Sequence, residues 1–322
     1  MQMTLELREH WLWDFWLATD GADHHLFYLQ APRSLGDPER RHWNASIGHA
    51  MSRDLQAWRV VDDALSVGPP GAFDDLATWT GSVLRWHDEW AMLYTGTSHA
   101  EEGLVQRIGL ATSPDLHTWH RHGDAVLEAD SERYETLDLD MWPDEAWRDP
   151  WLTRLPDGSA LALFTARSNT GARHDRGVVG RARSHDLRSW ETLDPIVTPQ
   201  GFGQLEVPQL LELGDHWYLL FSSDIGTQSE ERRRTGPGTG TYYLIAESAD
   251  GPFEMIGDGA LEADPVGSTY AGRVHNDASG EPCFLAWERA NADGTFVGRL
   301  GPARPLTVHP DGSLEISRVW TP

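Results

Sequence analysis

Three acidic residues in this 322-residue chain stand beside aromatic residues or proline: Asp14 in WLWDFW, Asp149 in WRDPW and Glu206 in LEVPQ. One acid near a strand end is usually an ordinary turn residue. Three in such similar surroundings indicate a shared chemical role. Cleavage of a glycosidic bond needs such a set, because one carboxylate attacks the sugar while a carboxylic acid protonates the departing oxygen.

The acid in that chemistry must keep its proton near neutral pH, which requires a raised pKa. Crowding three carboxylates into one place raises at least one pKa through like-charge repulsion, and flanking tryptophan and valine side chains add desolvation in the same direction. The third carboxylate is expected to bind sugar hydroxyls through hydrogen bonds that tighten at the transition state. These expectations depend on a fold that brings the three acids together.

An internal repeat indicates that fold. The motif reads SRDLQAW from Ser52, SPDLHTW from Ser113 and SHDLRSW from Ser184, with a weaker copy, SADGPF, from Ser248. Consecutive copies start 61, 71 and 64 residues apart. A small-residue strand precedes each copy, and paired β-rich runs joined by polar turns lie between the copies, as in hairpins.

The repeating unit is therefore four strands, seen about five times, which is typical of propeller blades. A solenoid also repeats, but usually with shorter periods and capping ends. No long segment shows a period of 3.6 residues, so few helices are expected. The sequence predicts an all-β fold, a single five-bladed β-propeller over residues 1–322. The repeat tryptophans (Trp58, Trp119 and Trp190) should pack between blades.

In a propeller the first strand of each blade lines the central channel. The predicted first strands begin near WLWDFW, WTGS, WRDPW, LEVPQ and STYAGR. Asp14, Asp149 and Glu206 then belong to the first, third and fourth blades. We therefore expect the three carboxylates to converge on one funnel.

Composition restricts the partners. The net charge is −24 and the chain contains no lysine. Nucleic-acid binding needs a basic surface, so nucleic acid and anionic membranes are unfavourable partners, whereas a neutral small-molecule or oligosaccharide substrate is suitable. No apolar run approaches the roughly 20 residues of a membrane span. The oligomeric state is not predicted.

The charged start of the chain lacks the apolar segment of a secretory signal, so we expect a cytoplasmic protein unless a leader has been removed. The single cysteine, Cys283, excludes an internal disulfide and agrees with a reducing compartment. We expect no cofactor. We also expect no metal, because the histidines lie on repeat strands and turns rather than at converging positions.

Five motifs in order resemble the propeller domain of glycoside hydrolase family 32 (invertases, inulinases, levanases) and, more distantly, the levansucrases of family 68. The resemblance covers roughly residues 11–290. HHLFYLQAP is similar to the family's HLFYQ strand, and IGHAMSRDLQAW to its WGHA-S-DL-W segment. FDDLATWTGSV looks like its acidic loop followed by F/W-S-G-S. RDP at Arg148–Pro150 and EVPQLLEL at Glu206–Leu213 stand where the family has RDP and EC-P-DL.

The resemblance implies that Asp14 is the nucleophile, Asp149 the transition-state stabiliser and Glu206 the acid/base. The substrate-binding residues that we predict are Arg148, Trp79, Thr80, Ser82 and Gln30, with Trp13 and Trp16 beside the nucleophile and His275 at the fifth blade. The segment Trp13-Asp14-Phe15-Trp16 is closer to the W-D-x-W form of levansucrases than to W-x-N-D-P-N of family 32. The C-terminal β-sandwich usual in family 32 has no counterpart in this sequence.

The sequence therefore predicts a retaining hydrolase of β-fructofuranosides, sucrose or short fructo-oligosaccharides, that forms a fructosyl-aspartate intermediate and that can also transfer the fructosyl group. One alternative is an inverting arabinofuranosidase or xylosidase on the same propeller, with its acid and base roughly 6.5–9.5 Å apart. A second alternative is a non-catalytic sugar-binding propeller, because a fold alone assigns no activity.

Overall fold

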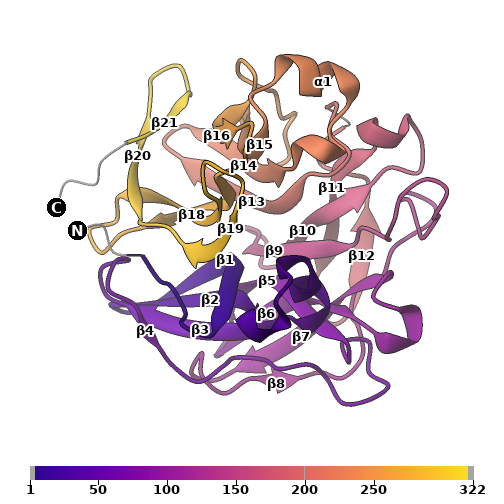
Figure 1. Cartoon of the computed structure of the whole chain (residues 1–322), viewed down its shortest axis with the longest axis vertical. Helices are drawn as coiled ribbons and strands as arrows, with labels where there is room; N and C mark the ends of the chain where they lie inside the picture. Colours follow the sequence, from indigo (N-terminus) through magenta and orange to yellow (C-terminus); the bar gives the residue numbers. More distant parts are fainter. Residues whose placement is uncertain (1–3, 199, 318–322) are drawn as a thin grey trace.

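Five antiparallel β-sheets surround a central axis in the computed structural model, which describes residues 4–198 and 200–317 (Figure 1). Within four of the sheets the strands lie in chain order, and in the fifth two successive strands pair with the same neighbour. This arrangement confirms the predicted five-bladed, all-β propeller, and no C-terminal sandwich follows it within the described residues.

The blades are built from short strands with polar turns. The first blade contains β1 (His10–Asp20), β2 (Asp23–Pro32), β3 (Ser46–Ser52) and β4 (Arg59–Val60), and the second β5 (Ala77–Trp86), β6 (Glu89–Thr97), β7 (Gln106–Ser113) and β8 (His120–Arg121). The third contains β9 (Arg148–Arg154), β10 (Ala160–Arg167), β11 (Gly177–Ser184) and β12 (Trp190–Leu193). The fourth contains β13 (Glu206–Leu213), β14 (His216–Ser223), β15 (Thr239–Ala246) and β16 (Ala260–Asp264). The fifth contains β17 (Thr269–Asn276), β18 (Pro282–Ala290), β19 (Phe296–Leu300), β20 (Arg304–Val308) and β21 (Leu314–Ile316).

Helices are short, as the sequence predicts. They are α1 (Glu230–Thr235) and the 3₁₀ turns η1 (Arg33–Leu35), η2 (Pro38–Asn44), η3 (His99–Glu101), η4 (Arg173–Asp175) and η5 (Ile225–Thr227). No helix within residues 4–198 or 200–317 is long and apolar enough to cross a membrane.

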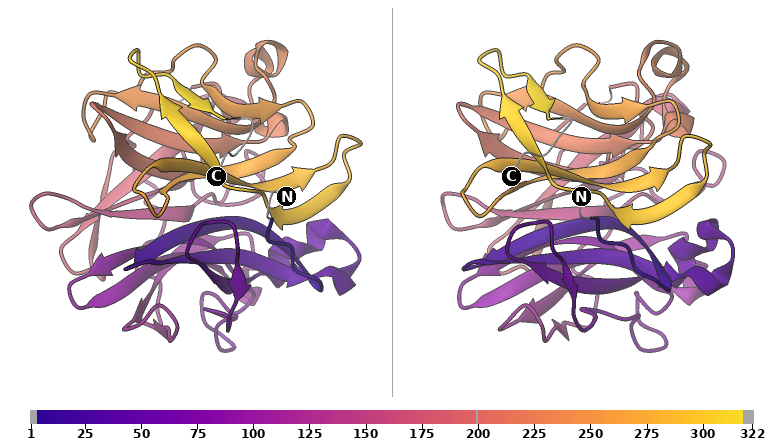
Figure 2. Two further views of the ribbon diagram at one scale, coloured as in Figure 1. Left: turned by 90° about the vertical axis from the view of Figure 1, so that its left-hand side faces the viewer. Right: turned by 60° about the vertical axis from the view of Figure 1, so that its left-hand side comes forward.

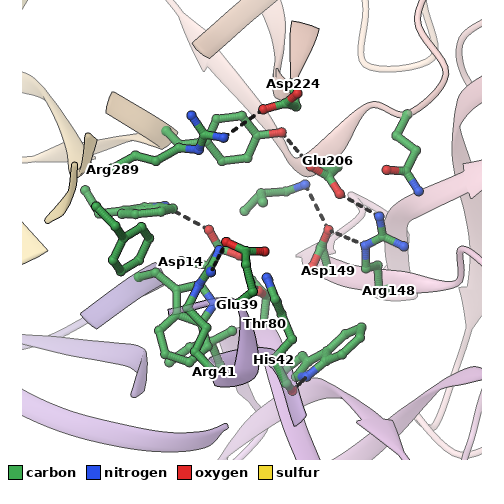
Figure 3. Close-up of a pocket in the computed structure, with 18 of the residues that line it drawn as sticks. Asp14, Glu39, Arg41, His42, Thr80, Arg148, Asp149, Glu206, Asp224 and Arg289 are labelled. Atoms are coloured by element: carbon green, nitrogen blue, oxygen red, sulfur yellow. Dashed lines mark hydrogen bonds and ion pairs between the residues drawn. The ribbon is translucent and has the colours of Figure 1, made fainter. Parts of the chain in front are cut away.

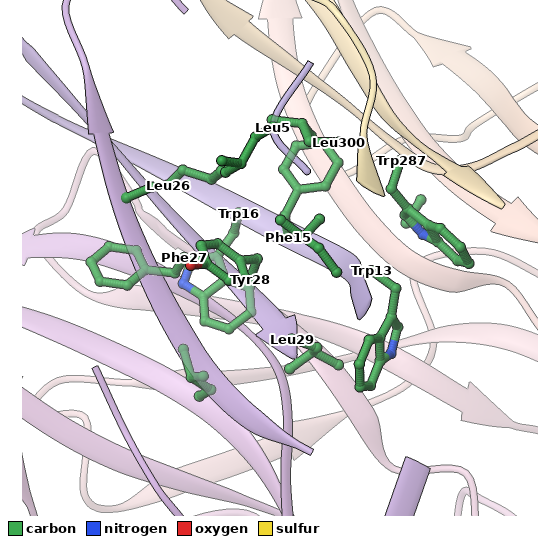
Figure 4. Packing of buried hydrophobic residues seen from close by; sticks show 14 of the residues in the cluster. Leu5, Trp13, Phe15, Trp16, Leu26, Phe27, Tyr28, Leu29, Trp287 and Leu300 are labelled. Carbon is green, nitrogen blue, oxygen red and sulfur yellow. The ribbon is translucent and has the colours of Figure 1, made fainter. Parts of the chain in front are cut away.

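The first and fifth blades meet along a closing seam (Figure 2). The backbone N–H of Leu300 donates to the carbonyl of Leu5 at 3.0 Å, so the segment before β1 pairs with the last blade. Leu5 and Leu300 also pack with Phe15 and Leu26 in one buried cluster (Figure 4). Apolar burial and backbone pairing thus close the ring from both ends of the chain.

The repeated motif forms the turn after the third strand of the first three blades. In the third copy, Asp186 Oδ1 accepts the backbone N–H groups of Arg188 (2.9 Å) and Ser189 (2.8 Å). Leu187 is buried, with a φ of 63°. The ring N–H of Trp190 donates to the Leu187 carbonyl at 3.0 Å. The repeat therefore closes a turn and anchors it in the core between blades.

Every first strand contains a β-bulge near the axis. The pairing register shifts once in each of β1, β5, β9, β13 and β17. The shift skips Asp14 in β1 and Thr80 in β5. Asp149, Val207 and Ala271 in the other three strands have positive φ values of 58°, 52° and 49°. A bulge re-aims a side chain out of the regular alternation, which is a common device next to active sites.

We predict that the turn carboxylate supports the fold and not the chemistry. Asp186→Ala should lower the free energy of unfolding by about 1–2 kcal/mol, because two backbone N–H groups lose their acceptor. Asp186→Asn keeps an acceptor oxygen, so its free energy of unfolding should fall by less than that of Asp186→Ala. Urea unfolding of both variants measures this difference, and equal stability of Asp186→Ala and the wild type would contradict it.

Candidate active site

A cavity of about 510 Å³ lies where the first strands of the blades meet. Seven of the eleven residues that the sequence singles out line it: Trp13, Asp14, Trp79, Thr80, Arg148, Asp149 and Glu206. The three carboxylates come from β1, β9 and β13 and face one space (Figure 3). The propeller therefore brings together acids that are more than 50 positions apart in the sequence.

The other four predicted residues do not line this cavity. Trp16 is 1% exposed and stacks on Phe27, with ring centroids 6.1 Å apart. Gln30 is buried on β2, where it pairs with Leu12 and Ser46 in the sheet. Both residues contribute to the packing of the first blade.

Ser82 and His275 also have partners elsewhere. Ser82 Oγ accepts the backbone N–H of Leu152 at 2.8 Å, so it connects the second and third blades. His275 Nε2 lies 2.9 Å from Thr19 Oγ1 and 3.2 Å from His24 Nδ1. Thr19 stands near the end of β1, beyond the cavity.

Asp14 has a strongly perturbed environment. Its Oδ1 accepts the ring N–H of Trp287 at 2.9 Å, and its Oδ2 accepts a longer bond of 3.4 Å from Thr80 Oγ1. Burial, followed by the charges of Asp149 and Glu206, raises the pKa of Asp14 to about 7. The positive charge of Arg41 and the bond from Trp287 act in the opposite direction. A carboxylate whose pKa lies near neutral pH is typical of a functional site.

Asp149 is held more rigidly. Its Oδ2 accepts Thr165 Oγ1 at 2.9 Å and the backbone N–H of Val207 at 3.2 Å. Its own backbone N–H donates to Thr95 Oγ1 at 3.0 Å. Burial raises the pKa of Asp149, while Arg148, 3.7 Å away, lowers it. Bonds from the third and fourth blades thus fix the carboxylate, and the bond to the second blade fixes the backbone of Asp149.

Glu206 receives one donor on each oxygen. Arg148 Nη2 donates to Oε1 and the hydroxyl of Tyr270 donates to Oε2, both at 2.5 Å. Burial and the charge of Glu206 raise the pKa of Tyr270 well above its ordinary value, so the hydroxyl keeps its proton. The Glu206 side chain remains 21% exposed, compared with 5% for Asp149. Glu206 is therefore accessible from the cavity while both its oxygens are oriented.

Several cavity residues have no motif that marks them in the sequence. Tyr270, Trp287 and Arg41 line the cavity and act on the carboxylates through a hydroxyl, a ring N–H and a charge. Arg41 is buried in η2, with its guanidinium 5.6 Å from the Trp13 ring and 4.7 Å from the Phe296 ring. Each belongs to a segment that reads as buried strand or turn, so only the fold reveals these contacts.

The described residues show no cluster of side chains suited to bind a metal ion. Among residues 4–198 and 200–317, no group of three or more histidine, cysteine, aspartate or glutamate side chains is arranged to hold a metal ion. The carboxylates of Asp14, Asp149 and Glu206 instead accept hydrogen bonds from protein donors.

Residues 16–296 match the family described as glycosyl hydrolases family 32 N-terminal domain. The chain belongs to that family. The match includes Asp149 and Glu206 and begins two positions after Asp14. The family 32 expectation from the five motifs is thus confirmed, along with its propeller.

Curated relatives agree with family 32. The chain is 30% identical over 203 residues to a rice β-fructofuranosidase, insoluble isoenzyme 7 (Oryza sativa subsp. indica), a match to 60% of this chain and 30% of the relative. It is 24% identical to a sucrose-6-phosphate hydrolase of Pediococcus pentosaceus, over 82% of this chain and 49% of the relative. The chain therefore spans only about a third to a half of the length of these relatives.

Solved structures share the fold. An inulosucrase from Halalkalicoccus jeotgali bound to kestose superimposes with a TM-score of 0.80 at 24% identity, over 98% of this chain and 90% of that one. Bacillus subtilis levansucrase gives 0.75 at 14% identity, over 97% and 87%. The propeller of this family 32 chain thus also has the levansucrase-like architecture that the Trp-Asp-Phe-Trp segment suggests.

We predict that the Asp14 carboxylate destabilises the folded protein at neutral pH. Its pKa of about 7 in the folded state exceeds the unfolded value of 3.8. The stabilising effect of the bound proton is therefore complete below pH 3.8 and is lost as the pH rises through 7. Linkage gives a change on the order of 4 kcal/mol across this window. The non-titrating Asp14→Asn variant should gain stability relative to the wild type from pH 4 to pH 8, as measured by denaturant unfolding.

Asp115→Asn is the matched control. Asp115 occupies the turn of the second repeat, where backbone hydrogen bonds lower its pKa. Its titration lies below pH 4, so the stability difference between this variant and the wild type should be flat from pH 5 to pH 8. The account of Asp14 would be contradicted if the Asp14→Asn difference were equally flat.

Proposed function

We propose that the protein is a retaining glycoside hydrolase that cleaves β-fructofuranosides, sucrose or short fructo-oligosaccharides, through a fructosyl-Asp14 intermediate. The observation that carries the proposal is the meeting of Asp14, Asp149 and Glu206 in one cavity with three different sets of partners. Relatives named β-fructofuranosidase and fructan 6-exohydrolase support the fructosyl specificity.

Asp14 is suited to the nucleophilic role. Trp287 holds one oxygen, while the bond of Thr80 to the other is long, so Oδ2 is the less engaged atom. In its ionised form Asp14 attacks the anomeric carbon of the fructosyl group. A bond forms between Asp14 and that carbon, and the bond from the carbon to the leaving oxygen breaks. Because the pKa of Asp14 is about 7, kcat/KM should fall as the pH drops below that value.

Glu206 is suited to proton transfer because its side chain lines the cavity and remains partly exposed. In the first step Glu206, in its protonated form, gives its proton to the leaving oxygen, and Arg148 and Tyr270 hold the carboxylate that results. In the second it takes a proton from a water molecule, whose oxygen attacks the anomeric carbon as the bond to Asp14 breaks. A sugar hydroxyl in place of the water gives fructosyl transfer by the same steps.

Asp149 is suited to stabilise the transition state. Its Oδ2 accepts hydrogen bonds from the Thr165 hydroxyl and the Val207 backbone N–H, so the carboxylate is held in one orientation. A fixed carboxylate can accept hydrogen bonds from the fructosyl hydroxyls, and such bonds strengthen as positive charge develops on the ring.

We predict that Asp14→Asn and Glu206→Gln each lower kcat on sucrose by at least about 10³-fold while the fold is kept. Initial rates and circular dichroism measure the two properties. Asp186→Asn makes the same chemical change in a blade turn and should retain the wild-type kcat. Turnover that survives in either cavity variant would remove that residue from its role.

The cavity is also electrostatically selective. Six carboxylates line it: Asp14, Glu39, Asp144, Asp149, Glu206 and Asp224. Each of its three guanidinium groups has an ion-pair partner: Arg41 with Glu39 at 3.2 Å, Arg148 with Glu206 at 2.5 Å and Arg289 with Asp224 at 3.0 Å. Burial lowers the pKa of His42 to about 3, so this ring is neutral. The lining therefore favours an uncharged sugar.

We predict that a phosphate group on the substrate is rejected. The kcat/KM for sucrose 6-phosphate should be at least about 10²-fold below that for sucrose, since a dianion must enter a negative cavity in which every described guanidinium group already has an ion-pair partner. Raising the ionic strength should narrow the difference. Equal kcat/KM values for the two substrates at low salt would contradict this account of specificity.

A further inference from the structure

Arg273, on β17, is a buried arginine that does not line the cavity. It is 1% exposed and belongs to the largest fully buried side chains. Its Nη1 donates to the carbonyl of Pro208 at 2.6 Å, and its Nε donates to the carbonyl of Phe15 at 3.4 Å. Its guanidinium lies 5.4 Å from the Trp151 ring centroid.

These three contacts fall on the strands that carry the three carboxylates. Phe15 directly follows Asp14, whereas Trp151 and Pro208 each stand two positions after an acid, Asp149 and Glu206. One side chain of the fifth blade therefore contacts the first strands of the first, third and fourth blades. Figure 1 shows β1, β9 and β13 meeting at the centre of the propeller.

The charge of Arg273 is unusual for its burial. Arg167 is equally buried, but it is paired with Glu135 at 2.7 Å. Arg273 has no such ion pair within the described residues, and its Nη2 is buried without a hydrogen-bond partner there. Taking a charged group out of water without a close partner is costly. A purely structural link would not require that charge.

Two nearby carboxylates interact favourably with the positive charge of Arg273. Burial lowers the pKa of Arg273 to about 10, while the charges of Asp149 and Asp14 raise it. Arg273 is therefore cationic at neutral pH, and the negative charges of both carboxylates favour its cationic form. At short range inside a protein such an interaction is stronger than it would be in water.

We propose that Arg273 is a positioning residue for the proposed reaction. Its hydrogen bonds fix the strands that carry Asp14 and Glu206, and its buried charge supports the ionised form of Asp14. This inference rests on the proposed function. Arg273 itself touches no substrate, since the cavity does not include it.

Other titratable groups also surround Asp14. They are Glu39, Arg41 and His42 of η2, Arg148 and Asp149 of β9, Glu206 of β13, Tyr270 of β17, and Asp144, Asp224 and Arg289 at the cavity wall. Among them Arg148 and Arg289 are engaged by Glu206 and Asp224. Removing the charge of Arg273 leaves Arg41 to oppose the protonation of Asp14.

The test compares pH profiles of kcat/KM on sucrose for Arg273→Met, Arg273→Lys and the wild type. Arg273→Met should shift the acidic limb of the kcat/KM profile to higher pH by about one unit. At a pH below that limb, kcat/KM should therefore be about tenfold lower than in the wild type. Arg273→Lys keeps the positive charge but loses the two hydrogen bonds that the guanidinium donates to Phe15 and Pro208. The acidic limb of its pH profile should therefore stay in place while kcat falls. Arg167→Met is the matched control: it removes an equally buried arginine and should lower stability without moving the limb.

A limb that stays in place in Arg273→Met, or that moves equally in Arg273→Lys, would overturn the proposal. If Arg273→Met does not fold, the unmoved limb and reduced kcat of Arg273→Lys still decide the outcome. Absence of turnover by the wild type on any fructoside would instead defeat the proposed function. The carboxyl ¹³C NMR titration of Asp14, identified by its loss in Asp14→Asn, then tests Arg273 without catalysis: unchanged titration in Arg273→Met would overturn its role.

Discussion

Three carboxylates placed in one buried cavity repel one another, and much of the structure around the axis serves to tolerate that repulsion. Arg148 lies between Glu206 and Asp149, Tyr270 and Trp287 donate to Glu206 and Asp14, and Arg273 contacts the three strands that carry these acids. Burial, followed by the charges of the neighbouring carboxylates, keeps the pKa values of both Asp14 and Asp149 raised. Such residual strain is a common property of sites built for proton and group transfer.

The propeller supplies the geometry for this arrangement. Its first strands meet at the axis, and a bulge in each of them turns a side chain out of the sheet's alternation. The positive φ of Asp149 is unfavourable for a residue other than glycine, so surrounding contacts must hold it. Hydrogen bonds from Thr165 and Val207 and to Thr95 provide them. The backbone and the side chain of this acid are thus fixed by different blades.

Much of this architecture is readable from the sequence. The Ser-x-Asp-Leu-x-x-Trp repeat predicts the blades because each copy closes a turn in its own blade, a local event. Placing the acids on first strands then predicts their convergence. Trp16 shows the limit of this reasoning, since it follows Trp13 by three positions, about 10 Å along a strand, and so packs beyond the cavity. Tyr270, Trp287 and Arg273 are not predictable, because their roles depend on contacts between blades that no local pattern records.

The stereochemistry of transfer tests the account most directly. With sucrose as substrate in a methanol–water mixture, Asp14 covers one face of the fructosyl group in the intermediate. Methanol then attacks the anomeric carbon from the opposite face, so the two displacements together restore the original configuration. NMR of the first-formed product should show methyl β-fructofuranoside. The α-anomer as first product would indicate a single displacement by water or alcohol and would contradict Asp14 as the nucleophile.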